Sequence, residues 1–175
     1  MMTDDFYSDA YIREILASCR TIAMVGASAN PSRPSYFAMK YLKAKGFTVI
    51  PVNPGEAGKE ILGERVHASL HDIAEKIDIV DIFRKSDAAL AITREAIAIG
   101  AKVVWMQLGV RNDAAALEAE QAGLKVVMNR CPKIEYGRLS GELSWAGVNS
   151  RLLSSKRQVL ASKGVQHRLL RAAEK

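Results

Sequence analysis

The chain has few of the residues that build secreted, metal-binding or membrane proteins. It contains two cysteines, Cys19 and Cys131, and three histidines among 175 residues. Two cysteines exclude a disulfide framework and favour a reducing compartment, so we expect a cytoplasmic protein. No apolar run approaches the roughly 20 residues that a membrane span needs. The polar start, with Asp4 and Asp5, is not expected to be a secretory signal.

Most of the chain also carries no net charge. The net charge is +6, from 25 basic and 19 acidic residues, but residues 1–150 hold 18 of each. The whole excess therefore lies in residues 151–175, and it does not mark the body of the protein as a nucleic-acid binder. We expect one domain over residues 1–150 and a basic C-terminal tail over 151–175. Binding of nucleic acid or a membrane by this tail is an alternative, although charged termini are usually solvated.

Three predicted helices end at a glycine that an apolar strand follows. Gly46, Gly100 and Gly123 occupy these positions, where a left-handed residue commonly ends a helix. Strands that are apolar on both faces and alternate with helices are typical of a parallel sheet covered on both sides. The five predicted strands cover residues 21–27, 47–52, 77–83, 101–106 and 124–128.

These patterns predict an α/β fold with three layers, α/β/α. We expect a Rossmann-like, doubly wound parallel sheet of five strands, and, counting strands along the chain, the order 3-2-1-4-5. Ser35 is the expected N-cap of the second helix. A loop with a short hairpin is expected between Asn53 and Ala68. The predicted helices cover residues 10–18, 36–45, 86–99 and 112–122.

The stretch from Thr21 to Lys45 has the form of a strand, a loop and a helix that together bind phosphate. Gly26 ends the apolar strand, and its missing Cβ lets backbone approach a ligand closely. The helix that follows the loop offers unpaired N–H groups and a partial positive charge to an anion. Arg33 adds a full positive charge at the mouth of the loop. An ordinary strand-to-helix turn has the same form, so this stretch alone leaves both interpretations open.

A dinucleotide such as NAD fits the sequence poorly. The fingerprint G-x-G-x-x-G retains only Gly26, because Ser28 and Pro31 stand at the other two glycine positions. Asn53 follows the second strand, where the fingerprint has the acidic residue that binds the ribose hydroxyls. The strand ends nevertheless carry small, amide and basic side chains, which suit another anionic ligand. The chain shows no nucleophile elbow, Ser–His–Asp set or metal-ligand cluster, so we expect a binding site without catalytic or metal-binding residues.

Five separated segments carry the most specific pattern: Val25–Ser28 with Arg33–Ser35, Val49–Pro54, Asp81–Arg84, Trp105–Gly109, and Cys131 with Pro132. Together they resemble the small bacterial stand-alone CoA-binding-domain proteins. These proteins are similar to the N-terminal CoA-binding domain of the succinyl-CoA synthetase alpha subunit. The resemblance covers about residues 15–145, and it implies a Rossmann-like fold with coenzyme A as the ligand.

The resemblance also implies a role for each matching position, although the synthetase's second domain, with its phosphorylated histidine, has no counterpart here. The implied CoA contacts are Gly26, Ala27, Ser28, Arg33, Pro34 and Ser35 at the phosphates, Val52, Asn53 and Pro54 at the adenosine end, Phe83 and Arg84 at adenine or phosphate, and Gln107, Val110, Cys131 and Pro132 along the pantetheine arm.

We therefore expect a non-catalytic protein that binds CoA or acyl-CoA as a carrier, sensor or regulator. The alternative is an enzyme that uses acyl-CoA or a nucleotide and needs a partner subunit. A homo-oligomer remains open. For Cys131, a mixed disulfide with the CoA thiol and a small apolar residue before Pro132 are both compatible with the sequence.

Deletion of residues 154–175 tests the expected division of the chain. Because the tail lies outside the segments that resemble CoA-binding proteins, the truncated protein should bind CoA with unchanged affinity in isothermal titration calorimetry. A loss of affinity on truncation would place the tail in the site.

Overall fold

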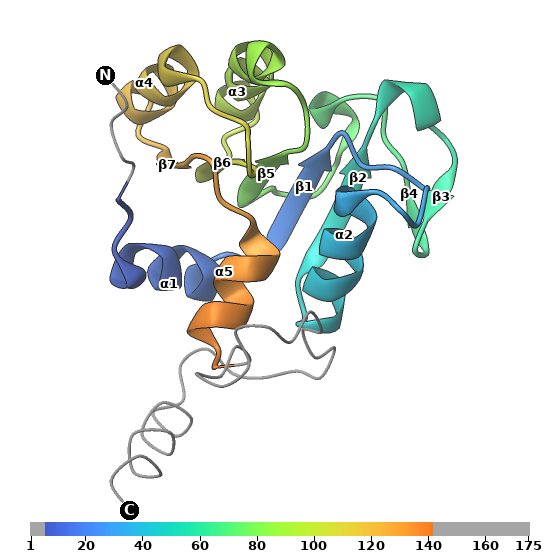
Figure 1. Cartoon of the computed structure of the whole chain (residues 1–175). Coiled ribbons are helices and arrows are strands. Elements are labelled where there is room, and N and C mark those ends of the chain that lie inside the picture. The colour runs from blue at the N-terminus through green and yellow to red at the C-terminus, as the bar shows by residue number, and fades with distance from the viewer. Residues whose placement is uncertain (1–5, 142–175) are drawn as a thin grey trace, which may run out of the picture.

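A five-stranded parallel sheet forms the centre of the protein, which a computed structural model describes over residues 6–141 (Figure 1). The strand order is β2-β1-β5-β6-β7, and every pairing in this sheet is parallel. The predicted fold class, a doubly wound α/β sheet, is confirmed. The strands are β1 (Thr21–Val25), β2 (Thr48–Val52), β5 (Ile79–Ile82), β6 (Val103–Met106) and β7 (Lys125–Val127).

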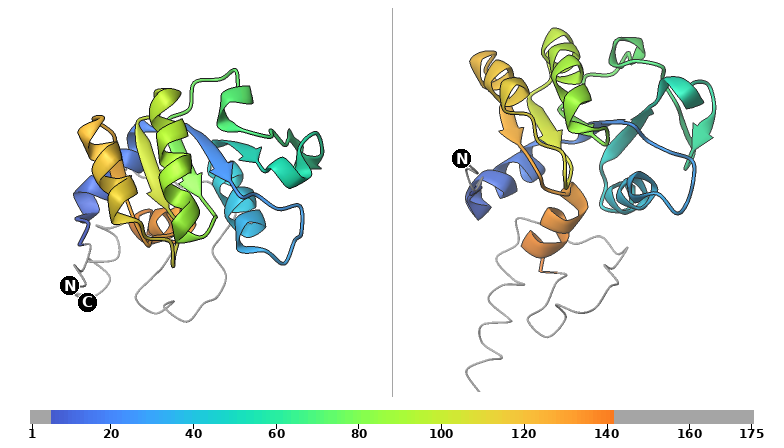
Figure 2. Two further views of the ribbon diagram at one scale, coloured as in Figure 1. Left: turned by 90° about the horizontal axis from the view of Figure 1, so that it is seen from above. Right: turned by 45° about the horizontal axis from the view of Figure 1, so that its top comes forward.

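Helices cover both faces of the sheet and complete the three layers. Figures 1 and 2 show α1, α2 and α5 on one face and α3 and α4 on the other. No helix between residues 6 and 141 has the length and hydropathy needed to cross a lipid bilayer. The helices are α1 (Asp9–Ser18), α2 (Pro34–Ala44), α3 (Ala89–Ala98), α4 (Asp113–Gln121) and α5 (Pro132–Leu139), with short 3-10 helices η1 (Pro54–Glu56), η2 (Leu70–Asp72) and η3 (Ser86–Ala88).

The predicted strand order 3-2-1-4-5 is wrong, because in the same counting the observed order is 2-1-3-4-5. The third strand, β5, pairs with β1, and Ala23 lies opposite Val80. The connection from β2 to β5 contains no α-helix that would place β5 beyond β2; it contains the expected hairpin, β3 (Glu60–Ile61) with β4 (Glu64–Arg65), and η2. Leu70 of η2 packs into the same apolar cluster as α3 and α4, so the chain returns across β1 on their face.

This order places a topological switch point between β1 and β5. The chain leaves β1 toward β2 on one side and leaves β5 toward β6 on the other. Ligands of doubly wound sheets bind beyond the carboxyl ends of the strands at such a point. The corrected order therefore predicts a site between the ends of β1 and β5.

Two helix starts also differ from the sequence-based expectation. Helix α2 begins at Pro34 with Arg33 as its N-cap residue, since proline at the first helical position has a dihedral angle already suited to a helix. Ser35, the expected N-cap, lies inside the helix, and its hydroxyl accepts a hydrogen bond from the Ser28 N–H at 3.2 Å. Helix α5, which begins at Pro132, is not among the helices predicted from the sequence.

The edge strand β7 is covered by tyrosines from the N-terminal segment. The Tyr11 hydroxyl accepts from the Val126 N–H and donates to the Val126 carbonyl, both at 3.1 Å. The Tyr7 hydroxyl accepts from the Met128 N–H at 2.9 Å. Because an edge strand with free backbone groups can pair with another chain, these hydroxyls protect the sheet from edge-to-edge association. Residues before β1 therefore close one side of the domain.

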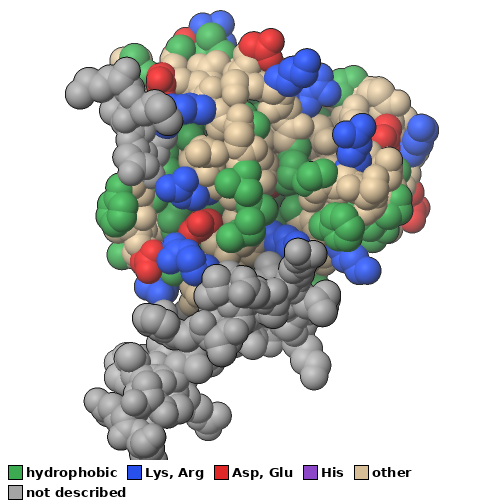
Figure 3. Space-filling model, viewed as in Figure 1, with side chains coloured by type: hydrophobic (Ala, Val, Ile, Leu, Met, Phe, Trp, Pro, Cys, Tyr) green, Lys and Arg blue, Asp and Glu red, His purple; other side chains and the backbone are tan. Residues whose placement is uncertain are grey.

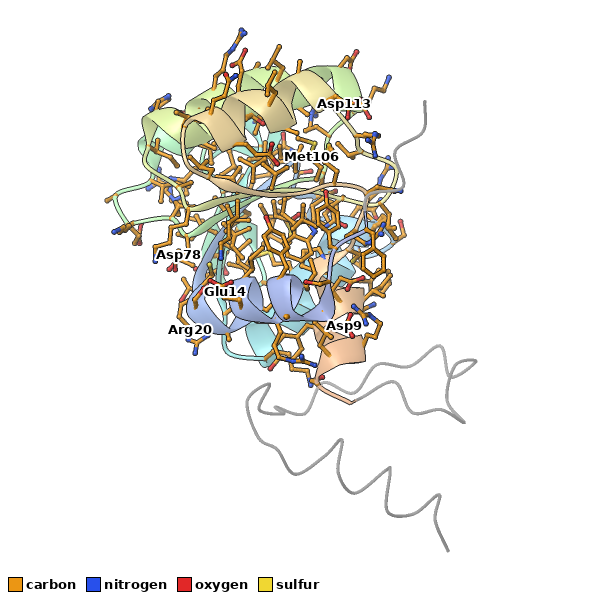
Figure 4. All side chains as sticks on the ribbon, turned by 90° about the vertical axis from the view of Figure 1, so that its left-hand side faces the viewer. Asp9, Glu14, Arg20, Asp78, Met106 and Asp113 are labelled. Carbon is orange, nitrogen blue, oxygen red and sulfur yellow. The ribbon has the colours of Figure 1, made fainter. Side chains whose placement is uncertain are left out.

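Asp78 joins three strands at the amino end of the sheet. Its carboxylate accepts from the N–H groups of Arg20 and Thr21, at 2.9 and 3.2 Å, and pairs with Lys102 at 2.7 Å. Figure 4 shows Arg20 and Asp78 at the same end of the sheet, opposite the end where Asp113 begins α4. Partial burial raises the pKa of Asp78, but the hydrogen bonds from Lys102 and the two N–H groups outweigh burial and lower the pKa overall.

Asp78→Asn should lower the free energy of unfolding by about 1.5–3 kcal/mol at pH 7, the range for hydrogen bonds to charged groups. Since the folded pKa is lowered, the carboxylate's contribution is complete above its unfolded pKa of about 3.9 and is lost as the pH falls through the folded value. Urea unfolding at pH 7 and at pH 3 measures this difference, with Glu120→Gln as the control for an exposed carboxylate. A loss of equal size at both pH values would contradict the assignment.

Candidate ligand-binding site

A pocket of about 940 Å³ lies at the carboxyl ends of β1, β5 and β6, where the switch point predicts it. Its lining comes from the loop after β1, the start of α2, the loops after β5 and β6, and the start of α5. Figure 3 shows apolar side chains gathered on this face between α5 and α2, with lysine and arginine side chains around them. A volume near the upper end of the usual range for small-molecule sites suits a long ligand.

The structure brings most of the sequence-predicted site residues together. Four of them do not line the pocket: Ala27, Val52, Pro54 and Pro132 support the backbone around it. The Ala27 carbonyl, for example, accepts from the Asn53 side chain at 2.9 Å. The predicted residues that line the pocket are Gly26, Ser28, Arg33, Pro34, Ser35, Asn53, Phe83, Arg84, Gln107, Val110 and Cys131.

Sequence reasoning missed several lining residues. Phe37 and Ile134 line the pocket with 51% and 41% of their surface exposed, beside Leu108, which is 56% exposed and lies in the segment Trp105–Gly109 that carries the resemblance. Lys133 also lines the pocket, and its Nζ lies 5.9 Å from the centroid of the Phe37 ring. Two of these residues, Lys133 and Ile134, lie on α5, a helix that the sequence pattern does not predict. The available signal was Pro132, since proline favours the first position of a helix.

Gly26 holds the ends of β1 and β5 in close contact. Its φ is +91°, and a Cβ there would lie 2.5 Å from the Phe83 carbonyl oxygen. The Gly26 N–H donates to the Val52 carbonyl at 2.8 Å, so the same residue also touches the end of β2. Both the dihedral angle and the available space therefore require glycine at this position.

The loop after Gly26 uses its own N–H groups to hold its shape. The Ala29 N–H donates to the Glu56 carboxylate at 3.1 Å, and the Ser32 N–H donates to the Asn30 side chain at 3.0 Å. The N–H groups of Ser28 and Asn30 also have acceptors within the loop and the start of α2. The loop therefore offers fewer free donors to a phosphate than the sequence pattern predicts, and more of the anion binding falls to side chains.

Basic side chains dominate the charge of the pocket. Among the described residues that line it, Arg33, Arg84, Lys85 and Lys133 are basic, and none is acidic. The ion pairs seen within residues 6–141 involve other cations than Arg33 and Arg84, which are both exposed. Uncompensated positive charge beside a concave surface attracts an anionic ligand.

Behind the pocket lies a fully buried carboxyl group. Asp81 is 0% exposed inside β5 and contacts the pocket through Gln107. The Gln107 Nε2 donates to both carboxyl oxygens of Asp81, at 2.8 and 3.1 Å. Burial raises the pKa of Asp81 to about 8, against the opposing effect of the Gln107 hydrogen bond.

Cys131 lines the same side of the pocket at the N-cap position of α5. Burial raises the pKa of its thiol, although the N–H groups of Ile134 and Lys133 donate to the sulfur and act in the opposite direction. Asp81 raises the pKa further through its charge. A thiol with a raised pKa is protonated at neutral pH and is a weak nucleophile, which disfavours a spontaneously reactive Cys131.

Comparisons with known proteins give one family model and several similar proteins. Residues 20–137 match the family model described as CoA binding domain. The uncharacterised protein YneT of Bacillus subtilis is 36% identical over 74% of this chain and 94% of its own length. A hypothetical protein from Pyrococcus horikoshii is 42% identical, with a TM-score of 0.73 over 79% of this chain and 96% of that chain. A dinucleotide-forming acetyl-coenzyme A synthetase of Candidatus Korarchaeum cryptofilum, 24% identical with a TM-score of 0.57, shares the fold over 66% of this chain and 27% of that chain.

Gly26→Ala should destabilise the protein more than Gly58→Ala, although both glycines have similar positive φ angles, +91° and +84°. Left-handed backbone costs a residue with a Cβ about 1–2 kcal/mol. A Cβ at position 58 meets nothing within 4 Å, whereas one at position 26 meets the Phe83 carbonyl. Overpacking of this kind adds about 1–3 kcal/mol to the loss. Urea unfolding of both variants measures the difference, and equal losses would show that β1 and β5 do not depend on this contact.

Proposed function

This chain belongs to the CoA-binding-domain family, and on that premise we propose that its pocket binds coenzyme A or an acyl-CoA in the cytoplasm. The protein acts as a carrier, sensor or regulator of CoA and not as a catalyst. The pocket between β1, β5, β6 and α5 supports this proposal by its chemistry as well as by its position at the switch point.

The observation that carries the proposal is that both basic and apolar side chains line the pocket. Coenzyme A has three phosphate groups at its nucleotide end and a long, weakly polar pantetheine arm. The pocket offers four basic side chains and no acidic one among its described lining residues. It also offers the apolar side chains of Phe37, Leu108 and Ile134. A smaller nucleotide would leave this apolar part unused.

The proposal divides the ligand between different parts of the pocket. Arg33, at the start of α2, and Arg84, after β5, bind the phosphates, because guanidinium groups match phosphate oxygens in geometry and charge. Gln107, Val110 and Cys131, after β6 and β7, follow the pantetheine arm. Asn53 lies on the adenosine side, where its amide also fixes the loop after β1 through the Ala27 carbonyl.

Isothermal titration calorimetry with CoA, dephospho-CoA and NAD tests the proposal. We expect CoA to bind more tightly than dephospho-CoA, since the arginines also recognise the 3′-phosphate, and NAD to bind more weakly than either. Arg33→Ala should weaken CoA binding by about tenfold or more, the equivalent of at least ~1.4 kcal/mol. Arg65→Ala removes an exposed arginine on β4, outside the pocket, and should leave the affinity unchanged.

Binding of NAD in preference to CoA would refute the proposed ligand. Equal effects of the Arg33 and Arg65 substitutions would refute the proposed phosphate contact. Circular dichroism and the urea midpoint of each variant establish that a changed affinity does not come from unfolding.

A further inference from the structure

Asp81 and Gln107 form a buried pair whose outer member belongs to the pocket. Asp81 lies in the centre of the sheet, where its neighbours in register are Met24 on β1 and Trp105 on β6. Gln107 is 5% exposed, and the part of it that is not against Asp81 borders the ligand space. From the helix layer, the Cys131 thiol is a titratable group that Asp81 acts on, and the charge of Asp81 raises the pKa of that thiol.

A primary amide has a donor side and an acceptor side. In the structure the Gln107 Nε2 is turned toward Asp81, which leaves Oε1 as the acceptor on the other side of the carboxamide. This arrangement suits ionised Asp81, whose two oxygens only accept. When Asp81 is protonated, its hydroxyl needs an acceptor, and Oε1 of Gln107 provides one if the carboxamide rotates. The charge of Asp81 and the orientation of Gln107 are therefore coupled.

We propose that Asp81 is a positioning residue for the ligand, which decides through Gln107 whether the pocket presents a hydrogen-bond acceptor or a donor. This inference rests on the proposed function for the identity of the ligand. The pantetheine arm carries amide N–H groups and a thiol as donors and amide carbonyls as acceptors. Because the structure turns Nε2 of Gln107 toward Asp81, CoA is bound with Oε1 as the acceptor of a donor on the arm and with Asp81 ionised.

The coupling makes CoA affinity depend on pH with a definite sign. Burial raises the pKa of Asp81 in the free protein to about 8, so the acid is mostly protonated at pH 7. A ligand that donates to Oε1 stabilises the ionised form and lowers the pKa of Asp81 in the complex. Binding then releases protons between the two pKa values. Affinity rises as the pH rises toward 8, by at most about tenfold per pH unit, and levels off above it.

Calorimetry of the full chain with CoA at pH 6, 7, 8 and 9 tests this, in buffers of different ionisation enthalpy. The protein variants are wild type and Asp81→Asn, which has nearly the same shape and does not titrate. Wild type should release up to one more proton per CoA than Asp81→Asn at pH 7. Its affinity should also rise between pH 6 and 8 relative to the variant. Titration of CoA's own phosphate and thiol groups is common to both proteins and cancels in the comparison.

A second measurement uses the free wild-type protein, so it depends neither on CoA binding nor on the folding of a variant. In NMR spectra of the free wild-type protein, the side-chain amide signals of Gln107 should shift with a midpoint near pH 8, together with the Asp81 carboxyl carbon. Signals of Gln107 that stay constant through the Asp81 titration would overturn the inference. The same proton release in wild type and Asp81→Asn would also overturn it. Absence of CoA binding to wild type would instead overturn the proposed function.

Discussion

The contact between the backbone of Gly26 and that of Phe83 is the constraint on which the site depends. It brings the ends of β1 and β5 within van der Waals distance at the switch point of the sheet. Because no Cβ intervenes, the loop after β1 and the loop after β5 form one continuous surface. Arg33, at the start of α2, and Arg84, in the loop after β5, both line the pocket. A positive site is thus built by strand pairing before any ligand is present.

The pocket has basic side chains on its rim and a titratable carboxyl group buried behind it. Its rim carries four basic side chains, whose charges are hydrated and cost little to maintain. Behind Gln107, the buried Asp81 is costly to ionise, since water is excluded and its hydrogen-bonding partner is a neutral amide. The rim suits recognition of phosphates, and the buried pair suits discrimination among the hydrogen-bonding groups of the arm. One ligand with a charged end and a long, less polar end uses both.

The sequence was sufficient for the fold class, because glycine-ended helices followed by apolar runs reflect local and strongly periodic physics. Strand order was not predictable in the same way, since it depended on whether the segment from Asn53 to Asp78 crossed β1. That crossing is decided by where Leu70 packs, which is a tertiary choice. Most predicted ligand contacts meet at one pocket because strand ends converge. The pairing of Asp81 with Gln107 joins residues 26 positions apart and left no local pattern.

A crystal structure of the full chain grown with CoA tests the proposed site most directly. CoA should lie in the pocket between β1, β5, β6 and α5, with phosphate oxygens within hydrogen-bonding distance of Arg33 and Arg84. The pantetheine arm should lie beside Gln107 and Cys131. CoA bound elsewhere on the protein, or bound in this pocket with its phosphates away from both arginines, would contradict the proposed site.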